Sequence, residues 1–220
     1  MSDNPHLATP PVLAGAPLDG ARAAAVLVHG RDHGAEEMLD LVRRLALDDV
    51  AYLIPLAAGR SWYPGRLFEP ISANEPWLGF TLDAYEATVR QAMAAGIPPE
   101  RIVVGGFSQG ACVTAELVAR RPRRYGGVAL LTGGLMGSED ELAAPAPGLE
   151  GVPMFVATST LDTWVPTPRV EETVRIFRAA GADVTFSVDD DPEHHINDDA
   201  VQGTRRLIAG ARSPGRAGKS

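Results

Sequence analysis

The sequence has a single cysteine, Cys112, among 220 residues, so no disulfide can form within the chain. This scarcity is typical of proteins from a reducing compartment. It leaves stability to a hydrophobic core, for which 45% hydrophobic residues suffice in a chain of this length. We expect Cys112 to be a buried packing residue.

Long apolar runs and basic residues are also scarce. Runs such as Ala23–Val28 fall far short of the ~20 residues of a membrane helix. The N-terminal Met-Ser-Asp-Asn-Pro-His has neither the basic nor the apolar part of a secretory leader. We therefore expect a cytoplasmic protein without a membrane span. Because 20 Lys and Arg face 28 Asp and Glu, the net charge of −8 disfavours nucleic acid as a partner.

The chain instead contains short apolar runs, rich in Val, Ile and Leu, that alternate with amphipathic helical segments. The pattern predicts strands at 25–29, 51–54, 101–105, 127–131, 153–158 and 184–188, and helices at 35–47, 80–95, 109–120, 168–180 and 198–209. Continuous apolar strands are typical of a parallel sheet buried on both faces. The predicted fold class is α/β, with a mostly parallel central sheet and helices on both faces.

No repeat or linker divides the chain. We expect an N-terminal arm at 1–20, one domain at 21–211 and a disordered tail at 212–220. Within the domain, residues 57–79 contain three prolines and two tryptophans but no clear period. A loop of this length inside a compact domain is uncommon and is usually functional.

The strongest motif is Gly106-Phe107-Ser108-Gln109-Gly110, a G-x-S-x-G between a predicted strand and a predicted helix. Such a sharp turn needs small flanking residues and exposes the serine hydroxyl at the edge of the sheet, as in the nucleophile turn of α/β-hydrolases. The alternative is a glycine-rich turn in which Ser108 only caps the helix. A phosphate-binding loop is not indicated, because the sequence has no G-x-G-x-x-G.

A nucleophilic serine needs a general base, and in this fold the acid and then the histidine follow the nucleophile along the chain. Asp162 is the candidate acid, because it is the only carboxylate in the segment after the fifth predicted strand. His194 and His195 are the only histidines after the serine, and their spacing leaves both open as the base. The acidic residues at 189–193 would either raise the pKa of the base or form a solvated loop.

Two backbone N–H groups are expected to bind the oxyanion. One belongs to the residue after the nucleophile, Gln109, and the other to an early loop, here Arg31 in the turn His29-Gly30-Arg31. His29 precedes the serine, so we expect it to shape this turn rather than to act as the base.

Aromatic residues in the predicted loops are the candidates for a substrate pocket. They are Trp62, Tyr63, Trp77 and Trp164. Aromatic side chains at such positions commonly wall a mostly apolar pocket. The alternative is that they only cover the edge of the sheet.

These motifs resemble the phospholipase/carboxylesterase family of α/β-hydrolases over most of the chain. The similarity lies in Val28-His29-Gly30, in the G-F-S-Q-G turn, in Asp162-Thr163-Trp164-Val165-Pro166 and in Glu193-His194-His195-Ile196-Asn197. The resemblance implies a triad of Ser108, Asp162 and His194, with His195 at a variable position. It also implies no cofactor and often a homodimer, and hydrolysis by such a triad needs no metal. Glu193 departs from the family's glycine and adds bulk and charge beside the base.

The sequence therefore predicts a serine carboxylesterase that acts on small or medium esters through an acyl-enzyme. Residues 57–79 look closer to bacterial carboxylesterases than to acyl-protein thioesterases, so thioesterase or lysophospholipase activity is the alternative for the same site. Alternatives of another class are a metal-dependent hydrolase and a non-catalytic binding protein. The metal ligands would come from His29, Asp32 and His33 and from the acidic cluster at 189–199 with His194 and His195.

Overall fold

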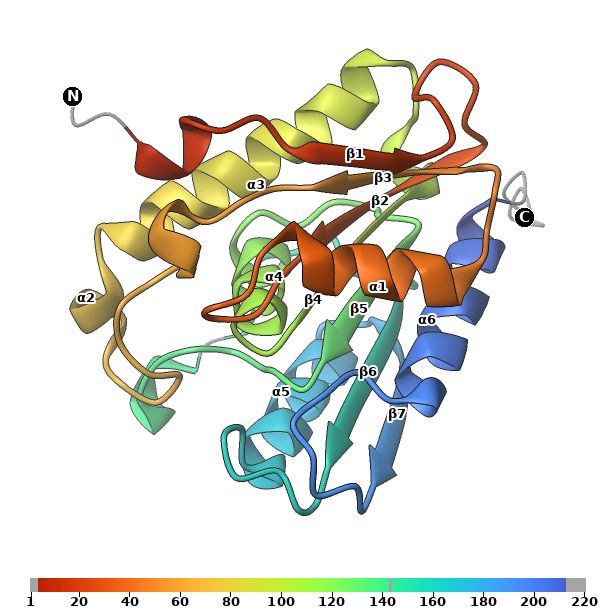
Figure 1. Ribbon diagram of the computed structural model, residues 1–220. Helices are drawn as coiled ribbons and strands as arrows, with labels where there is room; N and C mark the ends of the chain where they lie inside the picture. Colours follow the sequence, from red (N-terminus) through yellow and green to blue (C-terminus); the bar gives the residue numbers. More distant parts are fainter. Residues whose placement is uncertain (1–3, 143, 213–220) are drawn as a thin grey trace.

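The computed structural model describes residues 4–142 and 144–212, which build one seven-stranded sheet in the order β1-β3-β2-β4-β5-β6-β7 (Figure 1). β1 pairs antiparallel with β3, and the other neighbouring strands are parallel. The strands are β1 (Val12–Gly15), β2 (Ala23–Val28), β3 (Val50–Ile54), β4 (Ile102–Phe107), β5 (Gly127–Leu131), β6 (Pro153–Ser159) and β7 (Asp183–Asp189).

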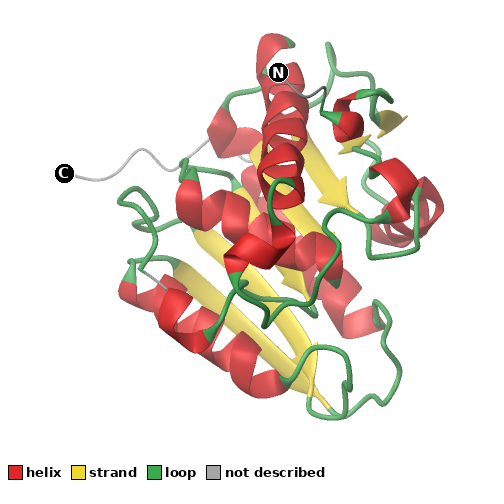
Figure 2. Cartoon of the chain, turned by 90° about the vertical axis from the view of Figure 1, so that its left-hand side faces the viewer, coloured by secondary structure: helices red, strands yellow, loops and turns green. Residues whose placement is uncertain are grey.

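Helices α1 and α6 cover one face of the sheet, and α3, α4 and α5 cover the other (Figures 1 and 2). The helices are α1 (Ala35–Leu45), α2 (Ile71–Asn74), α3 (Trp77–Ala94), α4 (Gln109–Arg120), α5 (Thr167–Ala179) and α6 (Asp198–Ala211), with 3-10 turns at Pro5–Leu7, Ala58–Arg60, Pro99–Arg101 and Glu139–Glu141. Successive strand residues face opposite sides, so Val26 packs toward α3 and α4 whereas Leu27 packs toward α1 and α6. Each side chain so buried contributes about 1.5–3 kcal/mol.

The predicted α/β fold is confirmed, and each predicted strand and helix is present with ends that differ by a few residues. The ends of three helices have a visible cause. The Asn197 side chain accepts the Ala200 N–H at 2.9 Å at the start of α6. Gly96 and Gly181 follow α3 and α5 with φ of +91° and +87°, values that glycine adopts without strain.

The main difference from the sequence-based expectation lies at the N-terminus. Residues 1–20 were expected to form an arm, but Val12–Gly15 joins the sheet as β1 by pairing with β3. Four residues at a sheet edge carry too little pattern to be predicted, because the pairing is made with a partner distant in the sequence. Apart from Arg212, the tail expected at 212–220 lies outside the described residues.

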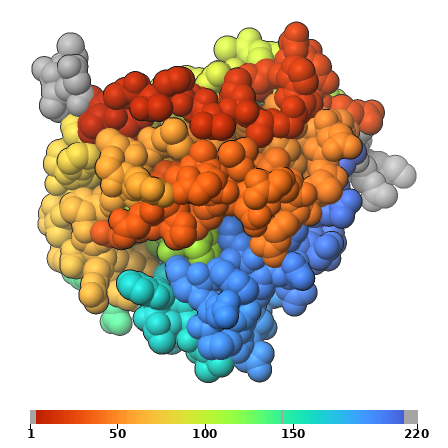
Figure 3. Space-filling view, in the orientation of Figure 1, coloured from red at the N-terminus to blue at the C-terminus, as the bar shows by residue number. Residues whose placement is uncertain are grey.

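Parallel strands place the segments that follow them at one edge of the sheet. The loops after β2, β4, β6 and β7 therefore meet there, although they come from widely separated parts of the sequence. In Figure 3 the orange segment that includes α1 and the blue C-terminal segment adjoin on one face, with a small green area from the middle of the chain between them.

Within the described residues, no helix has both the length and the apolarity needed to cross a membrane.

Candidate active site

Ser108 occupies the sharp turn between β4 and α4. Its backbone has φ +53° and ψ −118°, a strained conformation for a residue with a side chain. The flanking glycines allow this turn. A Cβ on Gly110 would lie 2.1 Å from the Val28 carbonyl oxygen, and one on Gly106 would lie 2.5 Å from the Gly110 backbone. The requirement for small residues on both sides of the serine, expected from the motif, is therefore steric.

A continuous hydrogen-bonded chain runs from Ser108 through His194 to Asp162. The Ser108 Oγ lies 2.8 Å from His194 Nε2, and His194 Nδ1 lies 2.5 Å from Asp162 Oδ2. Because a carboxylate only accepts, Nδ1 carries the proton, and Nε2 is left to accept the serine hydroxyl. The structure thus brings together the three residues that the resemblance implied.

The Asp162 carboxylate is buried and fully engaged. Its side chain is 1% exposed. While Oδ2 meets the imidazole, Oδ1 accepts the backbone N–H groups of Trp164 and Val165 at 2.7 and 2.8 Å. These bonds satisfy a buried carboxylate and fix its plane, so the direction in which it presents Oδ2 to His194 is also fixed.

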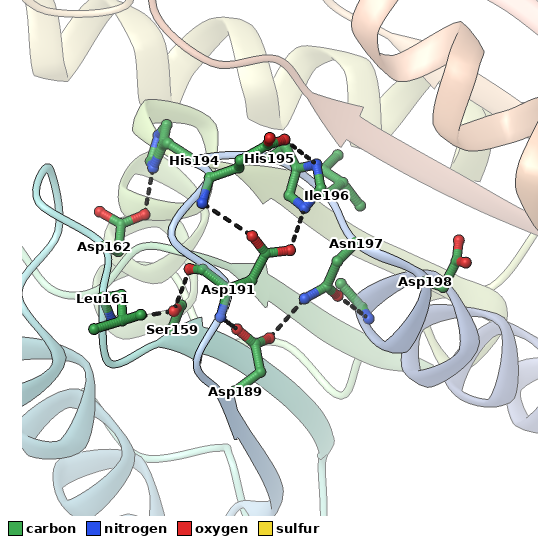
Figure 4. Close-up of polar contacts among 12 residues, drawn as sticks. Ser159, Leu161, Asp162, Asp189, Asp191, His194, His195, Ile196, Asn197 and Asp198 are labelled. Carbon is green, nitrogen blue, oxygen red and sulfur yellow. Dashed lines mark hydrogen bonds and ion pairs between the residues drawn. The ribbon is translucent and has the colours of Figure 1, made fainter.

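The loop between β7 and α6 is tied to the acid loop after β6 (Figure 4). Ser159 donates its hydroxyl to the Asp191 carbonyl at 2.6 Å. The Asp189 carboxylate accepts the Asp191 N–H at 3.0 Å and the Asn197 side-chain amide at 2.6 Å. The sequence suggested that the acidic residues at 189–193 either raise the pKa of the base or form a solvated loop. The structure gives Asp189 and Asp191 a further role, because both residues hold the loop in shape through hydrogen bonds.

The two neighbouring histidines have different partners. Figure 4 shows His194 directed at Asp162, whereas His195 is directed at Asp191, with Nε2 2.7 Å from Oδ2. Phe107 packs against the His194 ring with centroids 4.9 Å apart. Spacing along the sequence left both histidines open as the base, and the geometry places His194 next to the serine.

The turn after β2 fixes the direction of the Arg31 N–H. His29 Nε2 accepts the Ala57 N–H at 3.2 Å, so the ring proton is on Nδ1, which donates to the Gly30 carbonyl at 2.7 Å. In a trans peptide the N–H points opposite to the carbonyl, so the Arg31 N–H points away from His29. The Gly30 N–H is held by the Glu37 carboxylate at 2.7 Å, and burial raises the pKa of this carboxyl.

Gln109 presents a second N–H group next to the serine. As the first residue of α4, it has an N–H without a partner in the helix, at the positive end of the helix dipole. Its side chain is anchored to the segment opposite, since Oε1 accepts the Trp62 N–H at 2.9 Å and Nε2 donates to the Tyr63 carbonyl at 2.8 Å. These two bonds restrain the residue in position.

Two of the four predicted pocket residues are core residues, which corrects the expectation. Trp62 and Tyr63 are 0% and 3% exposed. The Trp62 indole donates to the His29 carbonyl at 2.9 Å, and its ring lies 4.9 Å from the His29 ring and 5.4 Å from that of His6. The segment therefore packs inward, and these side chains offer no surface to a substrate.

The other two predicted pocket residues are exposed. Trp77 begins α3, is 37% exposed and contacts the rings of Phe80 and His6. Trp164 is 73% exposed, and its ring centroid lies 6.2 Å from that of His194. Trp164 therefore lies beside His194, at the edge of the sheet where the triad is located.

His6 is a supporting residue that the sequence did not reveal. It is 3% exposed, its Nδ1 accepts the Ala58 N–H at 3.0 Å, and its Nε2 donates to the Trp62 carbonyl at 3.2 Å. Burial lowers the pKa of His6, consistent with a neutral ring. A lone histidine in a predicted arm carries no signal for this role, because its partners lie more than fifty positions along the chain.

The residues proposed as metal ligands do not converge. Both His29 ring nitrogens bind backbone groups, and His33 Nδ1 lies 3.3 Å from Glu37. Across the described ranges, no group of three His, Cys, Asp or Glu side chains is arranged to hold a metal ion.

The phospholipase/carboxylesterase family model matches residues 16–210. The crystal structure of a phospholipase/carboxylesterase from Dyadobacter fermentans DSM 18053 is similar, with a TM-score of 0.86 and 36% identity over 92% of this chain and 97% of that one. Acyl-protein thioesterase 1 of Gibberella zeae is 25% identical over 74% of this chain and 80% of its own length. For acyl-protein thioesterase 1 of Saccharomyces cerevisiae, 35% identity extends over only 33% of each chain. The chain therefore belongs to the phospholipase/carboxylesterase family and is a serine hydrolase of carboxylic esters.

Proposed function

We propose that the chain hydrolyses small or medium carboxylic esters through an acyl-enzyme on Ser108. The observation that supports this most directly is the geometry of Ser108, His194 and Asp162, with contacts of 2.8 and 2.5 Å. The first distance is within the range needed for a base to take the proton of a nucleophile, and the second joins the base to the acid that orients it.

In the first half-reaction, Ser108 Oγ attacks the ester carbonyl as its proton passes to His194 Nε2. The N–H groups of Arg31 and Gln109 stabilise the oxyanion that develops, each worth roughly 10²–10³ in rate. Asp162 stabilises the imidazolium. The bond to the alcohol then breaks, and His194 returns the proton to the departing oxygen, leaving an ester on Ser108.

In the second half-reaction, water takes the place of the alcohol. His194 removes a proton from water as its oxygen attacks the acyl carbon. Collapse of the second tetrahedral intermediate breaks the bond to Ser108, which regains its proton from His194. The carboxylic acid leaves, and no cofactor is needed.

Thioester hydrolysis is the second candidate for the same site. It is favoured by the similarity to acyl-protein thioesterases, although the phospholipase/carboxylesterase from Dyadobacter fermentans has the higher identity over most of the chain.

A cytoplasmic location and a homodimer remain predictions. Cell fractionation would test the location, and analytical ultracentrifugation would test the oligomeric state.

The test is turnover of p-nitrophenyl esters of increasing acyl length. We expect Ser108→Ala to lower kcat by roughly 10⁴–10⁶ on every ester, while Ser187→Ala on β7 leaves it unchanged. If Ser108→Ala keeps most of the activity, the proposed nucleophile is wrong.

A further inference from the structure

Trp164 combines high exposure with a fixed position beside the base. At 73%, it is the most exposed of the large apolar side chains that the structure describes. Its backbone is held, because its N–H donates to Asp162 Oδ1 at 2.7 Å. A large ring that is left in water but anchored next to His194 is suited to bind a substrate rather than to pack the core.

Two aromatic rings lie near the His194 ring, and they differ in exposure and distance. Phe107, which is 3% exposed, packs at 4.9 Å, whereas the exposed Trp164 lies at 6.2 Å. In the proposed mechanism the departing oxygen takes its proton from His194 Nε2, so the leaving group lies within hydrogen-bond reach of this ring. Because the Trp164 ring lies 6.2 Å from the His194 ring, an aromatic leaving group bound to His194 can come within the ~4.5–7 Å of Trp164 over which aromatic rings associate.

Carboxylates lie in the same loop as the base. Glu193 precedes His194 and has a side chain that is 77% exposed, and Asp191 lies in the same loop. The arginines at this edge of the sheet keep their charge, but their guanidinium groups are held by other partners. Arg31 donates to the carbonyls of Tyr63, Pro64 and Gly65, Arg60 pairs with Glu36, and Arg169 donates to the carbonyls of Leu135 and Gly137.

We propose that Trp164 is the platform of a leaving-group subsite that selects esters of aromatic alcohols, and that Glu193 directs this choice toward neutral or cationic leaving groups and against anionic ones. The inference rests on the proposed function. In the selected reaction, the bond from Ser108 Oγ to the acyl carbon forms, the bond to the aryl oxygen breaks, and His194 delivers the serine proton to the aryloxide.

The first test keeps the acyl group constant and changes the alcohol. The kcat/KM of phenyl acetate and methyl acetate is measured for the natural protein, Trp164→Ala and Trp164→Phe. We expect Trp164→Ala to lower the value for phenyl acetate about tenfold and for methyl acetate by less than about twofold, with Trp164→Phe restoring most of the loss. Leu13→Ala on β1, another exposed apolar residue, is the control and should change neither.

The second test changes the charge of the leaving group. Phenyl acetates with a meta amide, carboxylate or trimethylammonium group are compared. We expect Glu193→Gln to raise kcat/KM for the carboxylate ester by about two- to threefold relative to the neutral amide ester, which is the effect of one charge at ~8 Å in water. The change relative to the cationic ester should be about the square of that, and added salt should reduce both. Asp183→Asn, at the opposite end of β7, is the matched control.

The outcomes separate the two proposals. Equal losses on methyl and phenyl acetate in Trp164→Ala, or equal effects of Glu193→Gln and Asp183→Asn, overturn the subsite while leaving the esterase intact. No turnover of any ester by the natural protein, or turnover that survives Ser108→Ala, overturns the proposed function and the subsite with it.

Discussion

The side chain of Gln109 holds the backbone of Trp62, accepting its N–H at 2.9 Å. The residue that supplies a proposed oxyanion donor is thereby attached to a segment 47 positions earlier in the chain. That segment is itself fixed, because Thr81 donates its hydroxyl to the Trp62 carbonyl at 2.6 Å and the indole donates to His29. The position of the oxyanion donor therefore depends on a buried core, not only on the nucleophile turn.

Loss of the Gln109 side chain should lower kcat more than it changes KM. Gln109→Ala keeps the backbone N–H but leaves the buried Trp62 N–H without its side-chain partner and removes one of the bonds to the Tyr63 carbonyl, so the donor loses its restraint. We expect kcat to fall about tenfold, measured with p-nitrophenyl acetate. A change confined to KM would contradict a role in positioning the donor.

The two neighbouring histidines should respond very differently to replacement by alanine. His194→Ala removes the base and should lower kcat by roughly 10⁴–10⁶. His195 forms a partly exposed pair with Asp191, so His195→Ala should cost less than about fivefold. The comparison uses the same ester under the same conditions. The reverse order of effects would mean that His195 is the base.

The nucleophile could be predicted because its chemistry demands a specific local pattern. Ser108 must follow a strand, begin a helix and have small neighbours, and all three conditions can be read from adjacent residues. Asp162 could be predicted because no other carboxylate competed with it after β6. His194 and His195 could not be separated from spacing alone, since Asp189, Asp191 and the bonds between two loops decide which ring turns toward the serine.

The substrate pocket was predicted less well. Trp62 was expected to be exposed because it lies in an irregular segment, but His6 and His29 enclose its ring from distant parts of the chain. Burial of a loop residue depends on such long-range contacts, for which local sequence has no signature. The same holds for β1, whose partner β3 is about forty residues away.

Buried histidines should make the fold sensitive to acid. Burial lowers the pKa of His6 and of His29 from 6.5, and both rings accept a backbone N–H. The unfolded chain therefore takes up protons first. Stability is full above about pH 6.5 and falls as the pH drops toward the folded-state pKa, by at most ~1.4 kcal/mol per pH unit for each histidine.

The measurement is the free energy of unfolding in urea, over the range from about pH 7.5 to about pH 5.5. The dependence on pH should be weaker in His6→Gln than in the natural protein. The control His33→Gln changes a histidine whose side chain is 54% exposed and should leave the dependence as it is. Identical slopes in His6→Gln and the natural protein would remove His6 from this account.

Two glycine substitutions should have opposite effects on stability. The Cβ of Gly110→Ala would stand 2.1 Å from the Val28 carbonyl oxygen, so this variant should lose about 3 kcal/mol or more, or fail to fold. Gly210→Ala, in α6 with no atom within 4 Å of the new Cβ, should gain up to about 1 kcal/mol. Thermal unfolding of both variants checks this. A stable Gly110→Ala would mean that the turn and β2 are not in close contact.

The central claim is that Ser108 is a nucleophile activated by His194. The most direct measurement is labelling with a fluorophosphonate probe, followed by mass mapping of the adduct, on the natural protein, Ser108→Ala and His194→Ala. The account predicts one adduct, on Ser108, which is absent from Ser108→Ala and forms far more slowly in His194→Ala. Folded protein that takes up no label, or that is labelled equally well without Ser108, would contradict it.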